Sequence, residues 1–397
     1  MDHTTASLTT REPRTGVDFA LVGHQESWRA ASDVLAVLRG TERTRLPDDE
    51  IMEIFPWIPP RAVCNVEATS TTGAKARGLY IDCFIAPDRL DCEYLHDNIG
   101  RVRAAASRAI NAGARIVSLG GFSSILIEGN FDRLPGATDT VFTTGNTLTV
   151  AFIVQGIKKM CTLEERELCR STLLIVGATG DVGSGCARCL APFVKSVILC
   201  ARNAKRLQTL AAELEAGGTE VQVTTRLDHV PFTADIVICA ASLPSPLIRL
   251  RCVTRQAIIC DAGYPKNLKN SGDLTDTRIF FGGLGQIAGG LSFNPDLKGV
   301  LNRHPFPDVV HGCLLEGMAL ALERRFESFS QGRGFITPKR VEEIETVAAR
   351  HGIYLAPLYN ADGPIEGGLV SVAAKQPCTN GAIRSSTQRK RQADSSS

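Results

Sequence analysis

The sequence predicts an α/β protein with a doubly wound, mostly parallel sheet, a smaller α/β domain before it and helices after it. The first observation is the stretch 173–183, LLIVGATGDVG, where an apolar run passes straight into glycines and then into helix-forming sequence. The second is the regular alternation of strand-like and helix-like segments from Cys169 onward, which is typical of a parallel sheet. The third is the helical pattern that follows about Leu291.

The region from Val17 to about Thr144 mixes strands with helices. The motif DFALVGH indicates a first strand, and the turn Thr72-Gly73 separates two further strands. A helix that ends at Gly113 leads to a strand that enters a glycine-rich loop. The expected strands are 18–24, 62–71, 74–86 and 114–119, and the expected helices are 26–40 and 101–113.

A helix over Asn146–Glu165 should bridge the two domains. The parallel sheet then takes its strands near 172–177, 195–200, 234–240, 256–261 and 278–282, with loops at 242–246, 261–267 and 282–290. Beyond the sheet, Asp308 is a plausible N-cap for a helix over 309–329, and a second helix starts near Pro338 and stops at Gly352. The domains we expect are a disordered segment 1–16, an N-terminal α/β substrate domain 17–150, a cofactor domain 151–300, C-terminal helices 301–358 and a disordered tail 359–397.

Composition sets limits on function. The chain has 397 residues and a formal charge of +2, with 44% hydrophobic and 22% charged residues, which suits a globular protein and gives no sign of nucleic-acid binding. No apolar run approaches the ~20 residues of a membrane span, and the polar start lacks a signal peptide, so we expect a cytoplasmic protein. The 13 cysteines then indicate reduced thiols, and neither they nor the seven histidines have metal-ligand spacing.

The glycines after the strand at 172–177 predict a dinucleotide-binding turn of the Rossmann type. Gly177 would allow the tight turn, Gly180 would let the backbone approach a pyrophosphate, and Gly183 would let the helix pack close to the strand. The free N–H groups at the helix N-terminus would face the phosphates. The candidate cofactor-binding residues are Gly177, Thr179, Gly180, Asp181, Val182, Gly183, Ser184 and Arg202.

The end of the next strand indicates which dinucleotide is bound. Arg202, Asn203, Lys205 and Arg206 follow Cys200, and no acidic residue stands among them. An NAD-selective site usually has Asp or Glu here for the ribose 2′-OH, whereas Arg accommodates a 2′-phosphate. We therefore expect NADPH, with a solvated basic helix start as the alternative reading.

Cys313 is the residue best suited to covalent chemistry. It falls near the start of the helix that we expect after Asp308, where the helix dipole favours the thiolate, and Glu316 lies three residues further on the same side. Gly312 and Gly317 flank it, which suggests that something approaches this surface closely. From composition alone, a small buried cysteine on an amphipathic helix is the better interpretation.

Several separated blocks resemble one family. They are LVGH (21–24), SLGGFSSI (118–125), FTTGNT (142–147), IVGATGDVGS (175–184), the D-x-GYPKN motif at 261–267 and GCLLEGM (312–318). Their order and spacing, from about Phe19 to Leu358, are similar to those of the long-chain acyl-carrier-protein reductases of cyanobacterial type. Two departures are Ala262, where the family usually has glycine, and the His-Gly pair before Cys313, where the family tends to have an aromatic residue and alanine.

The resemblance implies a fatty-aldehyde-forming enzyme of lipid metabolism that reduces an acyl thioester with NADPH through a cysteinyl acyl-enzyme. It places the nucleophile on Cys313, with Glu316 beside it, and its partners would be acyl-carrier protein or acyl-CoA and an aldehyde-consuming enzyme. Donors for the developing oxyanion would come from the loops 120–124 and 143–147, with Lys266 or Tyr264 adding a side-chain donor. A structural turn explains Tyr264 and Lys266 equally well. The candidate substrate residues are Gly121, Ser123, Thr144 and Asn146.

Three other functions have to be weighed at this point. A shikimate-dehydrogenase-like enzyme would share the architecture, but it would use a Lys–Asp pair in the N-terminal domain and would not need Cys313. A glutamyl-tRNA reductase would need an extended basic surface, which the charge of +2 does not indicate. A non-catalytic NADPH-binding regulatory protein would bind cofactor without forming an acyl-enzyme.

Overall fold

The structure is a computed structural model that describes residues 16–40, 46–90, 93–128, 130–227, 233–242, 253–263, 266–268, 277–301, 303–332 and 334–365. Most of both predicted disordered ends lies outside these ranges. Within the predicted tail, however, β16 (Tyr359–Asn360) and β17 (Gly363–Pro364) form an antiparallel hairpin, so the ordered chain extends further than we expected.

The first sheet has six strands, in the order β13-β2-β3-β1-β4-β5. Its strands are β1 (Phe19–Gly23), β2 (Arg61–Thr69), β3 (Lys75–Asp82), β4 (Ile116–Leu119), β5 (Val141–Thr143) and β13 (Leu291–Asn294). The strands β3, β1, β4 and β5 run parallel, whereas β2 and β13 are antiparallel to their neighbours. The prediction of helix after Leu291 is wrong here, because β13 brings the chain back to pair with β2.

The second sheet also has six strands, all parallel, in the order β11-β10-β9-β6-β7-β8. They are β6 (Thr172–Val176), β7 (Ser196–Cys200), β8 (Glu220–Thr224), β9 (Ala234–Cys239), β10 (Val253–Asp261) and β11 (Arg278–Phe281). The first strand lies in the middle and the chain winds outward to both sides, which is the doubly wound Rossmann topology. The predicted fold class is confirmed, and β8 is a strand that the sequence pattern did not reveal.

The helices predicted over 26–40 and from Pro338 to Gly352 lie close to those limits, whereas the helix predicted over 101–113 begins earlier, at Leu95. The described helices are α1 (Trp28–Leu38), α2 (Asp48–Ile54), α3 (Leu95–Asn111), α4 (Phe122–Ile127), α5 (Asn146–Leu163), α6 (Asp181–Leu190), α7 (Ala204–Ala216), α8 (Lys298–Leu301), α9 (Gly312–Leu322) and α10 (Pro338–Arg350). The side chains of Ser27, Asn203 and Thr337 cap α1, α7 and α10 by accepting a backbone N–H. Short α2 and α4 have too little periodicity to be predicted.

A small third sheet holds the start of α9 in place. It consists of β12 (Leu284–Ile287), β14 (Val309–His311) and β15 (Ile353–Leu355), paired antiparallel in the order β14-β12-β15. The predicted loop 282–290 therefore contains a strand. Four short 3₁₀ turns complete the described elements, at Phe55–Trp57, Phe131–Arg133, Leu168–Arg170 and Ala191–Phe193.

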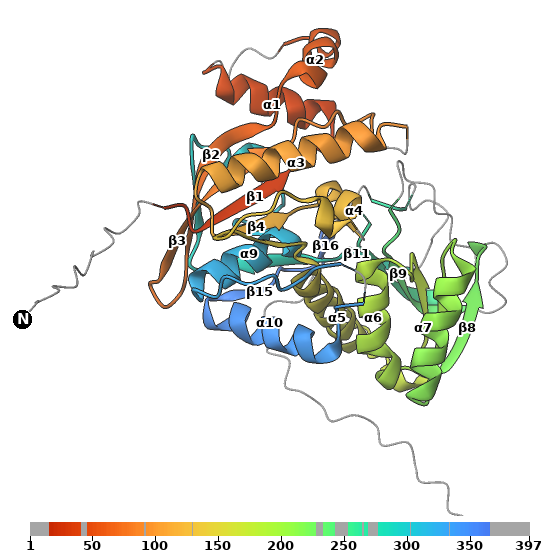
Figure 1. Cartoon of the computed structure of the whole chain (residues 1–397). Helices are drawn as coiled ribbons and strands as arrows, with labels where there is room; N and C mark the ends of the chain where they lie inside the picture. Colours follow the sequence, from red (N-terminus) through yellow and green to blue (C-terminus); the bar gives the residue numbers. More distant parts are fainter. Residues whose placement is uncertain are drawn as a thin grey trace, which may run out of the picture.

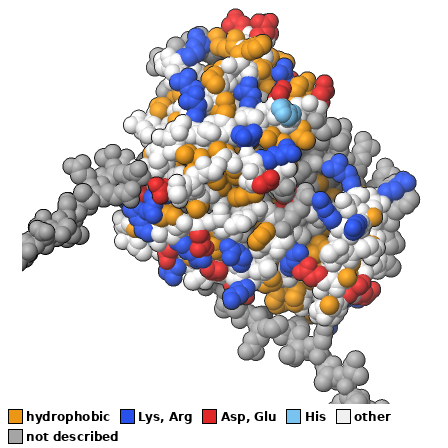
Figure 2. Space-filling model, in the orientation of Figure 1, with side chains coloured by type: hydrophobic (Ala, Val, Ile, Leu, Met, Phe, Trp, Pro, Cys, Tyr) orange, Lys and Arg blue, Asp and Glu red, His pale blue; other side chains and the backbone are white. Residues whose placement is uncertain are grey.

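The two large sheets share one core. Alternate residues of β1 face opposite sides: Ala20 and Val22 lie under α3, whereas Phe19 and Leu21 join a cluster that continues through α5 and α9 to the second sheet. In Figure 1, α3 lies on one side of the first sheet and α9 on the other, with α5 and α6 next to each other beneath. On the face shown in Figure 2, Lys and Arg side chains are interspersed with Asp and Glu, in keeping with the small net charge.

Candidate active site

The loop between β6 and α6 has the geometry that the glycine spacing predicts. Gly177 has a φ of 86°, and a Cβ there would lie 2.5 Å from the carbonyl oxygen of Ala240. A Cβ on Gly183 would lie 2.3 Å from the Gly177 carbonyl oxygen, so α6 packs directly on the turn. Among the described residues, a Cβ on Gly180 would meet only that same oxygen, at 3.3 Å. The backbone at Gly180 is therefore open in front of a helix N-terminus, a cradle that fits a pyrophosphate.

The remaining predicted cofactor residues lie on or beside this loop. Thr179 and Val182 are half-buried in it, and the Ser184 hydroxyl donates to the carbonyl oxygen of Asp181 at 3.2 Å. Arg202 is exposed just beyond the end of β7, and the Gly177 N–H donates to Cys200 at the end of that same strand over 2.8 Å. The backbone that carries Arg202 is thus next to the glycine turn, so its exposed guanidinium could reach a 2′-phosphate there.

Asp181 connects this loop to the N-terminal half of the protein. It is the first residue of α6 and is buried, and its Oδ2 accepts a hydrogen bond of 2.9 Å from Nδ2 of Asn146, the first residue of α5. Its Oδ1 has no partner among the described residues. Burial raises the pKa of Asp181 to about 7, and the nearby carboxylates of Glu128 and Glu316 act in the same direction.

Cys313 lies in the first turn of α9, one turn earlier than we expected. The helix does not begin after Asp308, because residues Val309–His311 form β14 and His311 takes the N-cap position. Asp308 instead has a φ of 55° and pairs with Lys298, Oδ1 to Nζ, at 2.7 Å. The predicted helix over 309–329 is therefore wrong at both ends, since α9 spans Gly312–Leu322.

The glycines around Cys313 allow close packing of protein against protein. A Cβ on Gly312 would lie 2.8 Å from backbone atoms of Thr149, and one on Gly317 would lie 2.1 Å from the Ser118 hydroxyl. A Cβ on Gly145, which precedes α5, would lie 2.0 Å from the carbonyl oxygen of Cys313 itself. Gly312 and Gly317 therefore allow α9 to pack closely against α5 and β4 of the protein itself.

The Cys313 thiol is buried, with 8% of the residue exposed. Burial raises its pKa to about 11, although hydrogen bonds from the backbone of Gly121 and Leu314 lower it. We expected the helix N-terminus to favour the thiolate, but burial has the larger effect on the pKa of this thiol. The backbone of Gly121, in the loop before α4, is thus within hydrogen-bonding range of the sulfur.

Glu316 is a fully buried carboxylate that binds protein groups. Its Oε1 accepts from the Thr143 hydroxyl at 2.5 Å, its Oε2 accepts from the Leu148 N–H at 3.0 Å, and the Ser330 hydroxyl lies 2.8 and 3.0 Å from the two oxygens. Burial raises the pKa of Glu316, while these hydrogen bonds lower it. The carboxylate therefore ties α9 to β5, α5 and the segment that contains Ser330, which is a positioning role.

The candidate substrate residues gather around α9 but differ in access. Gly121 has a φ of 55° and precedes α4, next to the thiol. Ser123 is buried, with its hydroxyl 3.7 Å from the Cys83 sulfur. Thr144 is also buried, and its N–H donates to the Ser330 carbonyl oxygen at 2.8 Å. The Ser123 hydroxyl thus contacts another protein side chain, whereas the buried Thr144 hydroxyl has no hydrogen-bond partner among the described residues.

Lys266 and Tyr264 have different outcomes. Tyr264 lies outside the described residues. The Lys266 ammonium donates to the Asp261 carbonyl oxygen at 3.2 Å and lies 4.8 Å from the centre of the Phe281 ring. The Asp261 carboxylate accepts the N–H groups of Gly263 and Asn267, which shapes the loop at the end of β10. This loop lies at the carboxyl edge of the parallel sheet, where Rossmann-type domains bind their ligands.

Sequence reasoning assigned no role to two residues beside the site. His24 follows β1 and its Nε2 accepts the Phe122 N–H at 3.1 Å, and Ser330 bonds to Glu316 and to the Thr147 N–H. His24 belongs to the block LVGH, which was the one available signal; Ser330 had none.

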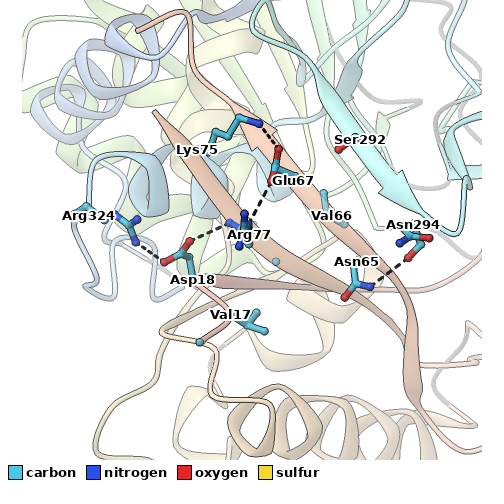
Figure 3. Close-up of a pocket in the computed structure, with 12 residues that line it drawn as sticks. Val17, Asp18, Asn65, Val66, Glu67, Lys75, Arg77, Ser292, Asn294 and Arg324 are labelled. Carbon is cyan, nitrogen blue, oxygen red and sulfur yellow. Dashed lines mark hydrogen bonds and ion pairs between the residues drawn. The ribbon is translucent and has the colours of Figure 1, made fainter. Parts of the chain in front are cut away.

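The Lys–Asp pair of a shikimate-type enzyme has no counterpart near these loops. Lys75 is the only lysine in residues 1–150, and its Nζ bonds to Glu67 at 2.7 Å. Figure 3 shows it in a cavity of about 820 Å³ together with Arg77, Asp18 and Arg324. Lys75 begins β3, whereas Asp82 ends it next to Gly23 of β1, so the strand length of roughly 20 Å separates this lysine from His24 and the thiol.

Within the described ranges, no His, Cys, Asp or Glu side chains come together in a way that could hold a metal ion. The same residues include no helix with the length and apolar character that crossing a membrane requires.

The chain is similar to known proteins over most of its length. A family model described as shikimate / quinate 5-dehydrogenase matches residues 161–281. The chain is 31% identical over 345 residues to the long-chain acyl-[acyl-carrier-protein] reductase of Synechococcus elongatus, covering 84% of this chain and 97% of that protein. It is 27% identical over 305 residues to the aminotransferase PigE of a Serratia species, covering 73% of this chain but only 34% of the longer protein.

Among solved structures, the quinate dehydrogenase of Corynebacterium glutamicum in complex with NAD covers 84% of this chain and 99% of its own, at 13% identity and a TM-score of 0.34. A likeness this low supports no conclusion about the site.

Proposed function

The chain belongs to the family of long-chain acyl-[acyl-carrier-protein] reductases, and we propose that it reduces an acyl thioester to an aldehyde through an acyl-enzyme on Cys313. The observation that carries the proposal is the position of this thiol. It lies in the first turn of α9, with the Gly145 backbone packed against the Cys313 carbonyl group and the Gly121 backbone close enough to lower the pKa of the thiol.

The protein is an oxidoreductase, and its cofactor is NADPH. The cradle at Gly180 and the α6 N-terminus would hold the pyrophosphate, and Arg202 would bind the 2′-phosphate. When bound, NADPH supplies a hydride to the acyl carbon. The loop that carries Lys266, at the carboxyl edge of the sheet, would border the nicotinamide side of this site.

In the first step, Cys313 attacks the carbonyl carbon of the thioester. A new C–S bond forms to the enzyme, the C–S bond to the carrier breaks, and the thiol proton passes to the departing thiolate, so the step is balanced. Because burial keeps the pKa of the Cys313 thiol at about 11, the proton must leave as the attack proceeds rather than beforehand.

In the second step, the acyl carbon accepts the hydride and negative charge develops on its oxygen. The N–H of Gly121 and the first-turn N–H groups of α9 would be the donors to this oxygen. Collapse of the intermediate expels the Cys313 sulfur, which takes up a proton and frees the aldehyde. Glu316 holds α9 and its surroundings in register for both steps.

The substrate carrier would be acyl-carrier protein or coenzyme A. The aldehyde product is reactive, so an enzyme that consumes it is a fitting partner. We propose a cytoplasmic location, because a chain of this length with 13 cysteines suits a reducing compartment.

The decisive experiment is to incubate the protein with acyl-carrier protein charged with a long-chain acyl group, without NADPH, and to digest it with trypsin. Residues 304–324 form one tryptic peptide in which Cys313 is the only cysteine. The proposal predicts one acyl mass on this peptide, which disappears when NADPH is added as aldehyde is released. A protein that binds NADPH but acquires no acyl group would be the regulatory alternative, and the same assay with acyl-CoA decides the carrier.

A further inference from the structure

His24 is a buried histidine with a defined partner at each ring nitrogen. It directly follows β1, and 6% of the residue is exposed. Its Nε2 lies 3.1 Å from the backbone nitrogen of Phe122, and its Nδ1 lies 3.1 Å from the carbonyl oxygen of Gln25. A backbone N–H can only donate, so Nε2 must be the unprotonated acceptor and Nδ1–H the donor to Gln25. The two contacts therefore fix a neutral ring in one tautomer.

The electrostatic surroundings agree with a neutral ring. Burial is the largest effect and lowers the pKa of His24, and His311 lowers it as well. The backbone contact to Gln25 and the carboxylate of Glu26 act in the opposite direction. A protonated ring would carry a hydrogen on Nε2 facing the Phe122 N–H, and the contact would be lost.

The peptide that His24 holds is next to the one that faces the thiol. Two backbone hydrogen bonds fix the chain on either side of Gly121. After it, the Phe122 N–H donates to His24 Nε2; before it, the Gly120 N–H donates to the Val22 carbonyl oxygen at 2.8 Å. Both anchors come from the end of β1. Between them, Gly121 adopts φ 55° and ψ −128°, a conformation suited to glycine. A Cβ on the neighbouring Gly120 would lie 2.6 Å from the Leu314 side chain, so this loop packs against the first turn of α9, and the Gly121 backbone lowers the pKa of the Cys313 thiol.

We propose that His24 is a positioning residue that keeps the backbone of Gly121 on the Cys313 sulfur by holding the following peptide through its unprotonated Nε2. This inference depends on the proposed function in one respect, because it takes Cys313 as the reactive thiol. Without the acceptor, the Phe122 N–H would be buried without a partner, and the loop would shift to satisfy it. The thiol would then lose a donor that stabilises its ionised form and the oxyanion that develops beside it.

The test measures the reactivity of the thiol directly. The full-length protein is alkylated with iodoacetamide between pH 7 and 10, and the modified fraction of the tryptic peptide 304–324 is followed by mass spectrometry. His24→Ala should slow alkylation of Cys313 by roughly two- to tenfold at each pH, the equivalent of one hydrogen bond. His24→Gln should restore the rate, because its Oε1 reaches the position of Nε2, whereas His24→Asn has its oxygen at the position of Nδ1 and should not.

A matched control is available in His351. It is also 6% exposed and is bonded at both nitrogens, to Ser70 at 3.1 Å and Glu323 at 2.8 Å. His351→Ala should lower the unfolding temperature yet leave the alkylation rate of Cys313 unchanged.

Equal rates for the unmodified protein and a folded His24→Ala variant would overturn the inference. If His24→Ala does not fold, equal rates for His24→Gln and His24→Asn would overturn it instead. Alkylation needs neither NADPH nor acyl thioester, so a failed acyl-enzyme experiment would leave this result standing.

Discussion

Asn146 donates from Nδ2 to Oδ2 of Asp181 over 2.9 Å, which joins the first residue of α5 to the first residue of α6. The residue before Asn146 is Gly145, whose backbone packs against the Cys313 carbonyl group. The cofactor loop and the nucleophile are thus connected through a single buried hydrogen bond and one close backbone contact. A change in the charge of Asp181 therefore acts first on the cofactor site. Asp181 is also close to the thiol through these two contacts.

The pKa of Asp181 predicts a pH-dependent affinity for NADPH. Burial raises this pKa to about 7, so the carboxyl group is protonated below pH 7 and becomes an anion beside the proposed pyrophosphate site above it. We expect NADPH affinity to fall as the pH rises from 6 to 8.5. Asp181→Asn keeps an acceptor for Asn146 and should make the affinity less dependent on pH. Calorimetric titrations of both proteins at several pH values measure the difference, and parallel pH profiles would contradict the assignment.

The same group predicts the pH dependence of stability. Its folded-state pKa of about 7 lies above the ordinary value of 3.8, so the folded protein holds this proton more tightly than the unfolded chain. The stabilisation is fully present below pH 3.8 and is lost as the pH rises through 7. Asp181→Asn should therefore gain stability relative to the unmodified protein between pH 5 and 8.5, by at most about 4 kcal/mol. Urea unfolding at both pH values measures this gain.

Arg202 predicts cofactor selectivity. Its guanidinium is exposed beyond β7, where the 2′-phosphate of NADPH would lie. Replacement by Ala should remove a charge-assisted contact of about 1.5–3 kcal/mol and weaken NADPH binding roughly ten- to a hundredfold, while NADH binding changes little. Dissociation constants for both cofactors test this expectation. If the unmodified protein binds NADPH and NADH equally well, the assignment of Arg202 is wrong.

Substitutions at two glycines of the cofactor loop test NADPH binding and protein stability separately. A side chain at Gly180 would meet only the Gly177 carbonyl oxygen, at 3.3 Å, so Gly180→Val should fold but fill the pyrophosphate cradle and abolish NADPH binding. A Cβ at Gly183 would lie 2.3 Å from that same backbone oxygen, so Gly183→Ala should lower the unfolding temperature as well. Unchanged NADPH affinity in Gly180→Val would show that the loop holds no phosphate.

Glu316 predicts a cost in stability. Truncation to Ala would leave the hydroxyls of Thr143 and Ser330 and the Leu148 N–H without their buried acceptor, which should cost at least about 3 kcal/mol. Glu213→Ala is the control, because that carboxylate is 48% exposed and pairs with Arg188 on the surface. Its loss should cost about 1 kcal/mol or less. Urea unfolding of the two variants should differ accordingly, and equal losses would contradict a positioning role for Glu316.

The features that could be predicted are those set by local chemistry. The turn at Gly177 needs a positive φ, and the helix at Gly183 needs close packing on the turn; both requirements are visible within a few residues. The regular alternation of strand-like and helix-like segments likewise predicted the second sheet and the fold class. In contrast, β13 pairs with β2, more than 200 residues earlier in the chain, and nothing in its own four residues indicates that distant partner.

The site could be predicted only in part for the same reason. Cys313 was found from its place near a helix start, but the pKa of its thiol depends on burial by distant segments, which outweighs the helix terminus. The hydrogen bond from Thr143 to Glu316 spans 173 residues, and that from Phe122 to His24 spans 98. No local pattern indicates such partners, so Glu316 was placed beside the nucleophile without its partners and His24 received no role.

Cys313→Ser tests the mechanism itself. The substitution changes the volume little, but it replaces a thiol with an alcohol that remains protonated near neutral pH and is a poor nucleophile. The variant should keep its fold and its affinity for NADPH, because Cys313 lies in α9 rather than in the cofactor loop. Acyl-enzyme formation should vanish, and aldehyde production should fall by on the order of 10³-fold or more.

The measurements are the acyl mass on peptide 304–324 and the rate of aldehyde release under saturating NADPH. An acyl group on Cys83 or Cys260 would keep the reaction but move the nucleophile. Full aldehyde synthesis by the Ser variant would exclude covalent catalysis at this position, and direct hydride transfer to the bound thioester would then be the better account.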